Sequence, residues 1–110
     1  MRQCCTVKLL NHSVEKELNR LDANMKAKFV HVCDLLETYG PKEVGLPHIK
    51  HLTGDLWEIR LVSKSGAARA IYVTLSERTI MVVHLFLKKT QKTPKQALSL
   101  AMKRIKGYTQ

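Results

Sequence analysis

Residues 56–87, LWEIRLVSKSGAARAIYVTLSERTIMVVHLFL, decide the fold. Three strand-like segments, residues 56–62, 68–75 and 79–87, are separated by short polar turns. Turns this short favour an antiparallel meander, in which each strand pairs with the next. The third segment is almost wholly apolar, which predicts an interior position in the sheet.

The first of these strands alternates between apolar and polar side chains. Because successive side chains of a strand point to opposite faces, we expect Trp57, Ile59 and Leu61 to face the core. Glu58 and Arg60 are then expected on the opposite face, where an ion pair between them is one interpretation.

Upstream of the meander, residues 6–10 predict a short strand, and two helical patterns follow it. The first begins at the capping residues Asn11 and Ser13. The second opens after residues 22–24 and ends at Gly40-Pro41. The apolar side chains at helical spacing are Val14, Leu18 and Leu21 in the first helix and Met25, Phe29, Val32, Cys33 and Leu36 in the second.

Residues 41–55 are predicted to form a loop, and a last helix should follow Thr93 as N-cap and Pro94 as first helical residue. The order is therefore β-α-α-β-β-β-α in one domain spanning residues 1–110. This predicts an α+β fold: a small, mostly antiparallel sheet with a helical hairpin on one face and a C-terminal helix.

Charge is distributed unevenly along the chain. The formal net charge is +10, and all nine acidic residues lie at or before Glu77, so the last part of the chain is purely basic. A segment with charge of one sign indicates a polyanionic partner, with nucleic acid as the first interpretation and simple solubility as the alternative. An anionic membrane surface is less favoured, because the sequence has no strongly amphipathic basic helix with aromatic anchors, and we expect no membrane partner. The three cysteines show neither disulfide nor zinc-ligand spacing, and we expect no cofactor or metal. The N-terminus lacks the apolar segment of a signal peptide, so we expect a cytoplasmic protein.

Motifs for serine hydrolysis, nucleotide binding by a glycine-rich loop and zinc proteolysis are not present in the sequence. Metal-independent cleavage of RNA needs none of them. A base must take the proton of a 2′-hydroxyl, cations must stabilise the charge on the phosphate, and an acid must protonate the leaving oxygen. Clustered Lys, Arg and His side chains can supply all three functions.

Candidates for these functions fall into three groups. They are His48, Lys50 and His51 before the meander; Arg60, Arg69 and Tyr72 on its strands; and Lys88, Lys89, Lys92 and Lys95 after it. Each group has a purely structural alternative: solvent-facing histidines, a basic loop without a task, and a core position for Tyr72 instead of stacking on a base. Arg69 lies in an apolar strand, so it must point at a partner or into a cleft.

These residues resemble a known family. The segments LWEIR (56–60), RAIY (69–72) and HLFLKKTQKTP (84–94) are similar to the phage-derived branch of the RelE/HigB toxin superfamily. The resemblance extends over about residues 30–108. It implies a toxin of a type II toxin–antitoxin pair, a metal-independent endoribonuclease that cleaves mRNA on the ribosome and is neutralised by a helix-turn-helix antitoxin.

The resemblance places the chemistry on Arg60 and Arg69 as phosphate contacts, with Lys88 and Lys89 as further basic positions. Two departures stand out. RelE has a lysine where this chain has Glu58, and the last helix lacks the expected Tyr at residues 95–97. Tyr108, His48 and His51 remain as alternatives for accepting the 2′-hydroxyl proton.

Two other functions stay open. One is a binding module, either a gyrase poison like the ParE branch of the same fold or a phage regulator that binds nucleic acid. The other is a degenerate family member that has kept only antitoxin binding.

Overall fold

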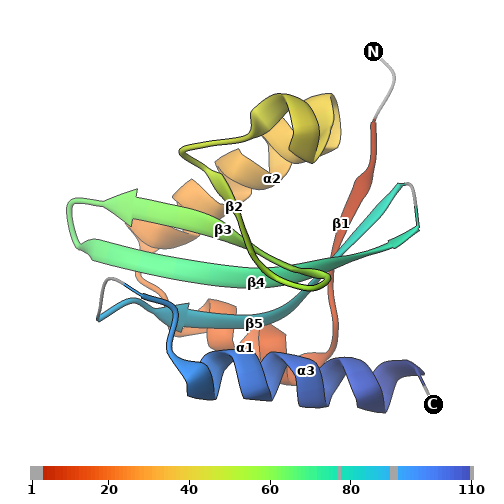
Figure 1. The fold of residues 1–110 in the computed structure, drawn as a ribbon. Coiled ribbons are helices and arrows are strands. Elements are labelled where there is room, and N and C mark those ends of the chain that lie inside the picture. The colour runs from red at the N-terminus through yellow and green to blue at the C-terminus, as the bar shows by residue number, and fades with distance from the viewer. Residues whose placement is uncertain (1–3, 77, 90–91, 110) are drawn as a thin grey trace.

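The computed structural model describes residues 4–76, 78–89 and 92–109. Five strands and three helices follow one another along the chain (Figure 1). Their bounds are β1 Thr6–Leu9, α1 His12–Asn19, α2 Ala23–Val44, β2 Ile49–Thr53, β3 Leu56–Ser63, β4 Gly66–Ser76, β5 Thr79–Leu87 and α3 Lys95–Thr109. The predicted turn at Glu77 and the motif residues Thr90 and Gln91 lie outside the described residues.

All five strands join one mixed sheet in the order β1-β5-β4-β3-β2. The meander β3-β4-β5 is antiparallel as predicted, and β1 adds to it in parallel, next to β5. The apolar β5 is an interior strand, which confirms its prediction. The loop predicted for residues 41–55 is wrong in part, because Ile49–Thr53 pairs with β3 as an edge strand. The α+β class is confirmed, and β2 adds one strand to the predicted order of elements.

Each face of the sheet has its own apolar cluster. The first is formed mainly by α1, α2 and one face of the strands, and its fully buried members include Val14, Val32, Leu36, Ile59 and Leu61. The second lies under α3 and contains Leu56, Ile71, Val73, Met81, Val83, Ala97 and Ala101. Figure 1 shows α3 running along one side of the sheet and α2 along the other. The sheet face that carries α3 is called the α3 face below.

The two N-terminal helices begin at side-chain caps. Asn11 accepts a hydrogen bond from the Val14 N–H at 3.2 Å, and Asp22 accepts one from the Met25 N–H at 2.8 Å. The predicted end at Gly40 is a real break, since its φ of 84° is left-handed and one more helical segment follows it to Val44. A Cβ at Gly40 would also meet the Cys4 sulfur at 2.9 Å.

The alternation predicted for β3 is confirmed, but the environments of two of its side chains were predicted wrongly. Trp57 shares the face of Ile59, yet it lies where the strand begins and remains 37% exposed. Glu58, expected on an open face, is completely buried. The segment before α3 covers it, and the Thr93 hydroxyl donates a hydrogen bond to its carboxylate.

The start of α3 differs from its prediction. The carbonyl of Pro94 accepts the first helical hydrogen bonds, from the N–H groups of Ala97 and Leu98, and the helix begins at Lys95. The Thr93 hydroxyl binds the sheet instead of capping the helix. Of the helices in the described ranges, none has the length and apolar character required to cross a membrane.

Candidate nucleic-acid interface

Basic side chains converge on the α3 face because of the strand register. Arg60 of β3 lies directly opposite Arg69 of β4, and Arg69 lies opposite Phe86 of β5. Lys88 follows Phe86 by two positions, so it points to the same face. Lys50 of the edge strand lies opposite Glu58, which is two residues before Arg60 on β3 and therefore on the same face. The register therefore gathers onto one face four cations that are far apart in sequence.

Arg69 belongs to the interior of this face. It is 3% exposed, and its guanidinium donates to the carboxylate of Glu58. The other oxygen of that carboxylate accepts a hydrogen bond from the Thr93 hydroxyl at 2.8 Å, and Arg69 also lies 3.4 Å from the same hydroxyl. The expectation that Arg69 points at a partner is confirmed. The pairing of Glu58 with Arg60 is wrong, because Arg69 takes that place.

Lys88 has a perturbed pKa because of its position on this face. Its pKa is lowered, first by partial burial and then by the positive charges of Arg69, Arg60 and Lys50. The carboxylate of Glu58 opposes this shift without cancelling it. A lysine whose pKa is lowered gives up its proton more readily than an ordinary one, which suits an acid–base role.

His48 is held beside Arg60 at the edge of the face. The Arg60 N–H donates to the His48 carbonyl at 2.7 Å, although β2 begins only one residue later. His48 and Arg60 line a pocket of about 320 Å³ together with Lys28, Pro47 and Val62. This is the place in the described structure where a predicted histidine and a predicted phosphate ligand meet.

The lysines after β5 extend the same basic surface. Lys89 is exposed next to Lys88, and Lys92 and Lys95 are exposed on either side of Thr93, whose hydroxyl is fixed to Glu58. These side chains therefore border the face at the beginning of α3. The name "basic face" is used below for Lys50, Arg60, Lys88, Lys89, Lys92 and Lys95.

Three predicted or alternative site residues lie elsewhere. His51 is on the opposite face of the sheet, where its ring meets that of Trp57 edge to face. Tyr72 is 1% exposed within the first apolar cluster, so stacking on a base at the basic face is contradicted. Tyr108 lies in the last turn of α3, about 20 Å from the start of the helix at about 1.5 Å per residue. His48 is therefore the remaining candidate base.

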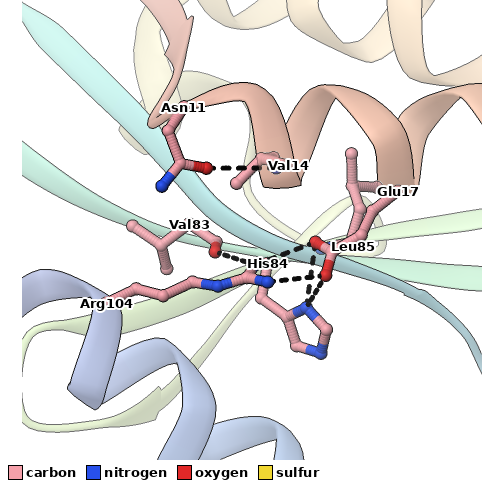
Figure 2. A network of polar contacts seen from close by, with 7 residues as sticks. All are labelled: Asn11, Val14, Glu17, Val83, His84, Leu85 and Arg104. Atoms are coloured by element: carbon pink, nitrogen blue, oxygen red, sulfur yellow. Dashed lines mark hydrogen bonds and ion pairs between the residues drawn. The ribbon is translucent and has the colours of Figure 1, made fainter.

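A polar network that the sequence analysis missed joins α1, β5 and α3 (Figure 2). The carboxylate of Glu17 accepts two hydrogen bonds of 3.0 Å from Arg104, one of 3.0 Å from the Leu85 N–H, and contacts His84 Nδ1 at 3.1 Å. Arg104 also donates to the Val83 carbonyl at 2.9 Å. Burial would raise the pKa of Glu17, but the hydrogen bonds from Arg104, Leu85 and His84 outweigh it and lower the pKa.

The network satisfies strand groups that β1 leaves uncovered. The last hydrogen bond from the β1 side reaches the Val82 carbonyl, after which α1 begins. A sequence signal for it exists, since Glu17 falls on the same helical stripe as Val14, Leu18 and Leu21. A carboxylate on an apolar stripe requires a buried partner.

Within the described ranges, no three His, Cys, Asp or Glu side chains are grouped as metal ligands would be. The groups able to act on a ligand at the basic face are thus cations and one histidine. Such a set can bind a phosphate diester, stabilise additional negative charge on it and exchange protons with its oxygens.

Comparison with known proteins agrees with this arrangement. A family model described as phage-derived protein Gp49-like matches residues 16–106. Among solved structures, the chain is similar to a chain of the archaeal RelE–RelB complex from Pyrococcus horikoshii OT3. The two are 28% identical, the match covers 76% of this chain and 94% of that chain, and the TM-score is 0.56. A search of curated proteins found no match.

Proposed function

The chain belongs to the phage-derived Gp49-like family, and from this membership, its RelE-like fold and its basic face we propose that it is the toxin of a toxin–antitoxin pair. We propose further that it is an endoribonuclease that cuts mRNA on the ribosome, in the cytoplasm. The observation that carries the proposal is the convergence of Lys50, Arg60 and Lys88 on one face. The solved RelE–RelB complex supports an antitoxin as the protein partner.

In the proposed reaction, the RNA lies with one phosphate against Arg60 and Lys88. A 2′-oxygen forms a bond to phosphorus as its proton passes to His48, and the bond from phosphorus to the 5′-oxygen breaks. Lys88 donates a proton to that leaving oxygen, and Arg60 stabilises the added negative charge in between. The proton given up by Lys88 and the proton taken by His48 balance, so solvent can restore both groups.

Arg69 has a different role in this proposal from the one its position in the motif implies. Arg69 is buried and bound to Glu58, so in this proposal it does not contact the phosphate. Its positive charge acts on Lys88 instead, whose pKa it helps to lower. The surface lysines Lys89, Lys92 and Lys95 hold the RNA backbone on either side, where each neutralised phosphate releases counterions.

The test is induced expression in a sensitive bacterium, with mapping of mRNA 5′ ends before and after induction. We expect growth arrest and new ends inside translated regions, and their loss in Lys88→Gln. The matched control is Lys16→Gln, which removes the same charge from an exposed site on α1. Arrest with intact mRNA would instead support a non-catalytic toxin such as a gyrase poison, and no arrest would support a regulator or a degenerate toxin.

A further inference from the structure

A second recess lies across the edge strand from the basic face. Its cavity volume is about 580 Å³, within the range of small-molecule sites. It is bounded by the end of α2 and by the Trp57 side of β2, β3 and β4. Trp57, Leu46 and Ile49 supply apolar walls, and Lys42 and Lys50 stand among the lining residues.

Two aromatic rings of this recess, those of Trp57 and His51, are accessible to solvent. Trp57 is 37% exposed and His51 is exposed, and their ring centroids lie 4.8 Å apart at an interplanar angle of 63°. Rings that meet edge to face leave ring surface open for a third ring to stack upon. The His51 Nε2 is already bound to the Gly54 carbonyl at 2.8 Å, which fixes the orientation of the imidazole.

The charges around the recess favour an anionic ligand. Its lining includes two lysines and no acidic residue. Lys50 also acts on Lys88, because its charge helps to lower the pKa of that residue. Because the strand register places the Lys50 side chain on the α3 face, Lys42 is the cation whose side chain is available on the recess side.

We propose that the recess binds a nucleobase of single-stranded RNA, stacked on Trp57, while Lys42 contacts an adjoining phosphate. Aromatic stacking together with backbone neutralisation is the usual means of holding single strands. The proposal rests on the proposed function in that RNA is the ligand. It adds a binding subsite that lies outside the cleavage chemistry and that fixes the position of the strand along the sheet edge.

The single tryptophan of the chain makes the test direct, because its fluorescence reports on this recess alone. The full-length protein is titrated with a short 2′-O-methyl oligonucleotide, which cannot be cut, and with an abasic oligonucleotide of equal length and charge. We expect quenching by the first and little by the second. Trp57→Leu should lower affinity about 10- to 100-fold by fluorescence anisotropy, and Trp57→Phe should retain most of it.

Equal quenching by the abasic strand or by inorganic phosphate would overturn the proposal, as would a folded Trp57→Leu variant that binds with unchanged affinity. Unchanged RNA affinity of the folded Trp57→Leu variant would fit a protein segment as the occupant of the recess. Because the probe is uncleavable, binding without quenching refutes only this inference. Quenching by a base in a protein that leaves cellular mRNA intact refutes only the nuclease proposal.

Discussion

Glu58 and Arg69 form an ion pair inside the basic face, with exposed fractions of 0% and 3%. The Thr93 hydroxyl occupies the second oxygen of the carboxylate, so the pair ties β3 and β4 to the segment that leads into α3. The segment carrying Lys92 and Lys95 is thereby anchored over the sheet, and their place at the face depends on a buried acid.

Arg69→Ala should lower the free energy of unfolding by about 3–5 kcal/mol, because it leaves a buried carboxylate without its cation. Urea unfolding at neutral pH measures this loss. The double variant Glu58→Leu, Arg69→Met removes both charges and should be clearly more stable than Arg69→Ala. A double variant no more stable than the single one would show that the unpaired charge is not the cause.

Removing a neighbouring cation should raise the pKa of Lys88 toward its ordinary value of 10.5. Arg60→Gln deletes one of the positive charges that lower it, and Glu58→Gln should shift it further down, since that carboxylate raises it. NMR titration of the lysine side-chain carbons measures both shifts. Shifts of the same sign in the two variants would contradict the proposed electrostatic environment.

The same lowered pKa predicts how stability changes at high pH. Between the pKa of Lys88 in the folded protein and 10.5, the unfolded chain binds more protons than the folded one. The contribution of Lys88 to the free energy of unfolding therefore rises with pH in that window. The free energy of unfolding of the wild type should therefore increase relative to that of Lys88→Met as pH rises through this window, as measured from unfolding curves of both proteins.

Glu17→Gln should lower the free energy of unfolding by about 2–3 kcal/mol at neutral pH, because it weakens charge-assisted hydrogen bonds to Arg104. The pKa of Glu17 is lowered, so its stabilisation is present above its ordinary value of 4.5 and is lost as pH falls through the lowered pKa. The difference between variant and wild type should thus shrink in acid. Glu15→Gln, at an exposed site on the same helix, is the control.

Tyr72→Phe should leave the protein as stable as the wild type or make it more stable, by about 1 kcal/mol or more. The Tyr72 hydroxyl is buried without a hydrogen-bond partner in the described structure, and burial raises its pKa. Removing an unsatisfied buried hydroxyl removes its desolvation cost. A lower melting temperature for Tyr72→Phe would show that the hydroxyl has a partner in solution.

The meander and its faces could be predicted because local patterns specify them. Ile59 and Leu61 are completely buried on the side that the alternation of residues 56–62 indicates. Strand β2 could not be predicted in this way, because its pattern contains a lysine and a histidine, as an exposed edge strand allows. Trp57 shows the limit of alternation, which gives the face of a side chain but not its distance from the strand end.

The site was predictable in its residue types and less so in its geometry. Arg60, Lys50 and Lys88 are brought together as cations on one face, whereas Glu58 changes the role of Arg69. That pairing depends on a diagonal contact between strands and on Thr93, which is 35 residues from Glu58 in sequence. Periodicity within one segment contains no information about such long-range contacts.

The junction of Glu17, His84 and Arg104 also has a consequence for biosynthesis. Glu17 and Arg104 are separated by 87 residues, and β1 pairs with a strand that is translated only after most of the chain. The first strand and helix are therefore synthesised well before their partners in β5 and α3. A nascent chain of this protein cannot pair β1 at the sheet edge until β5 has been made, and the basic face is assembled only after the start of α3 has followed.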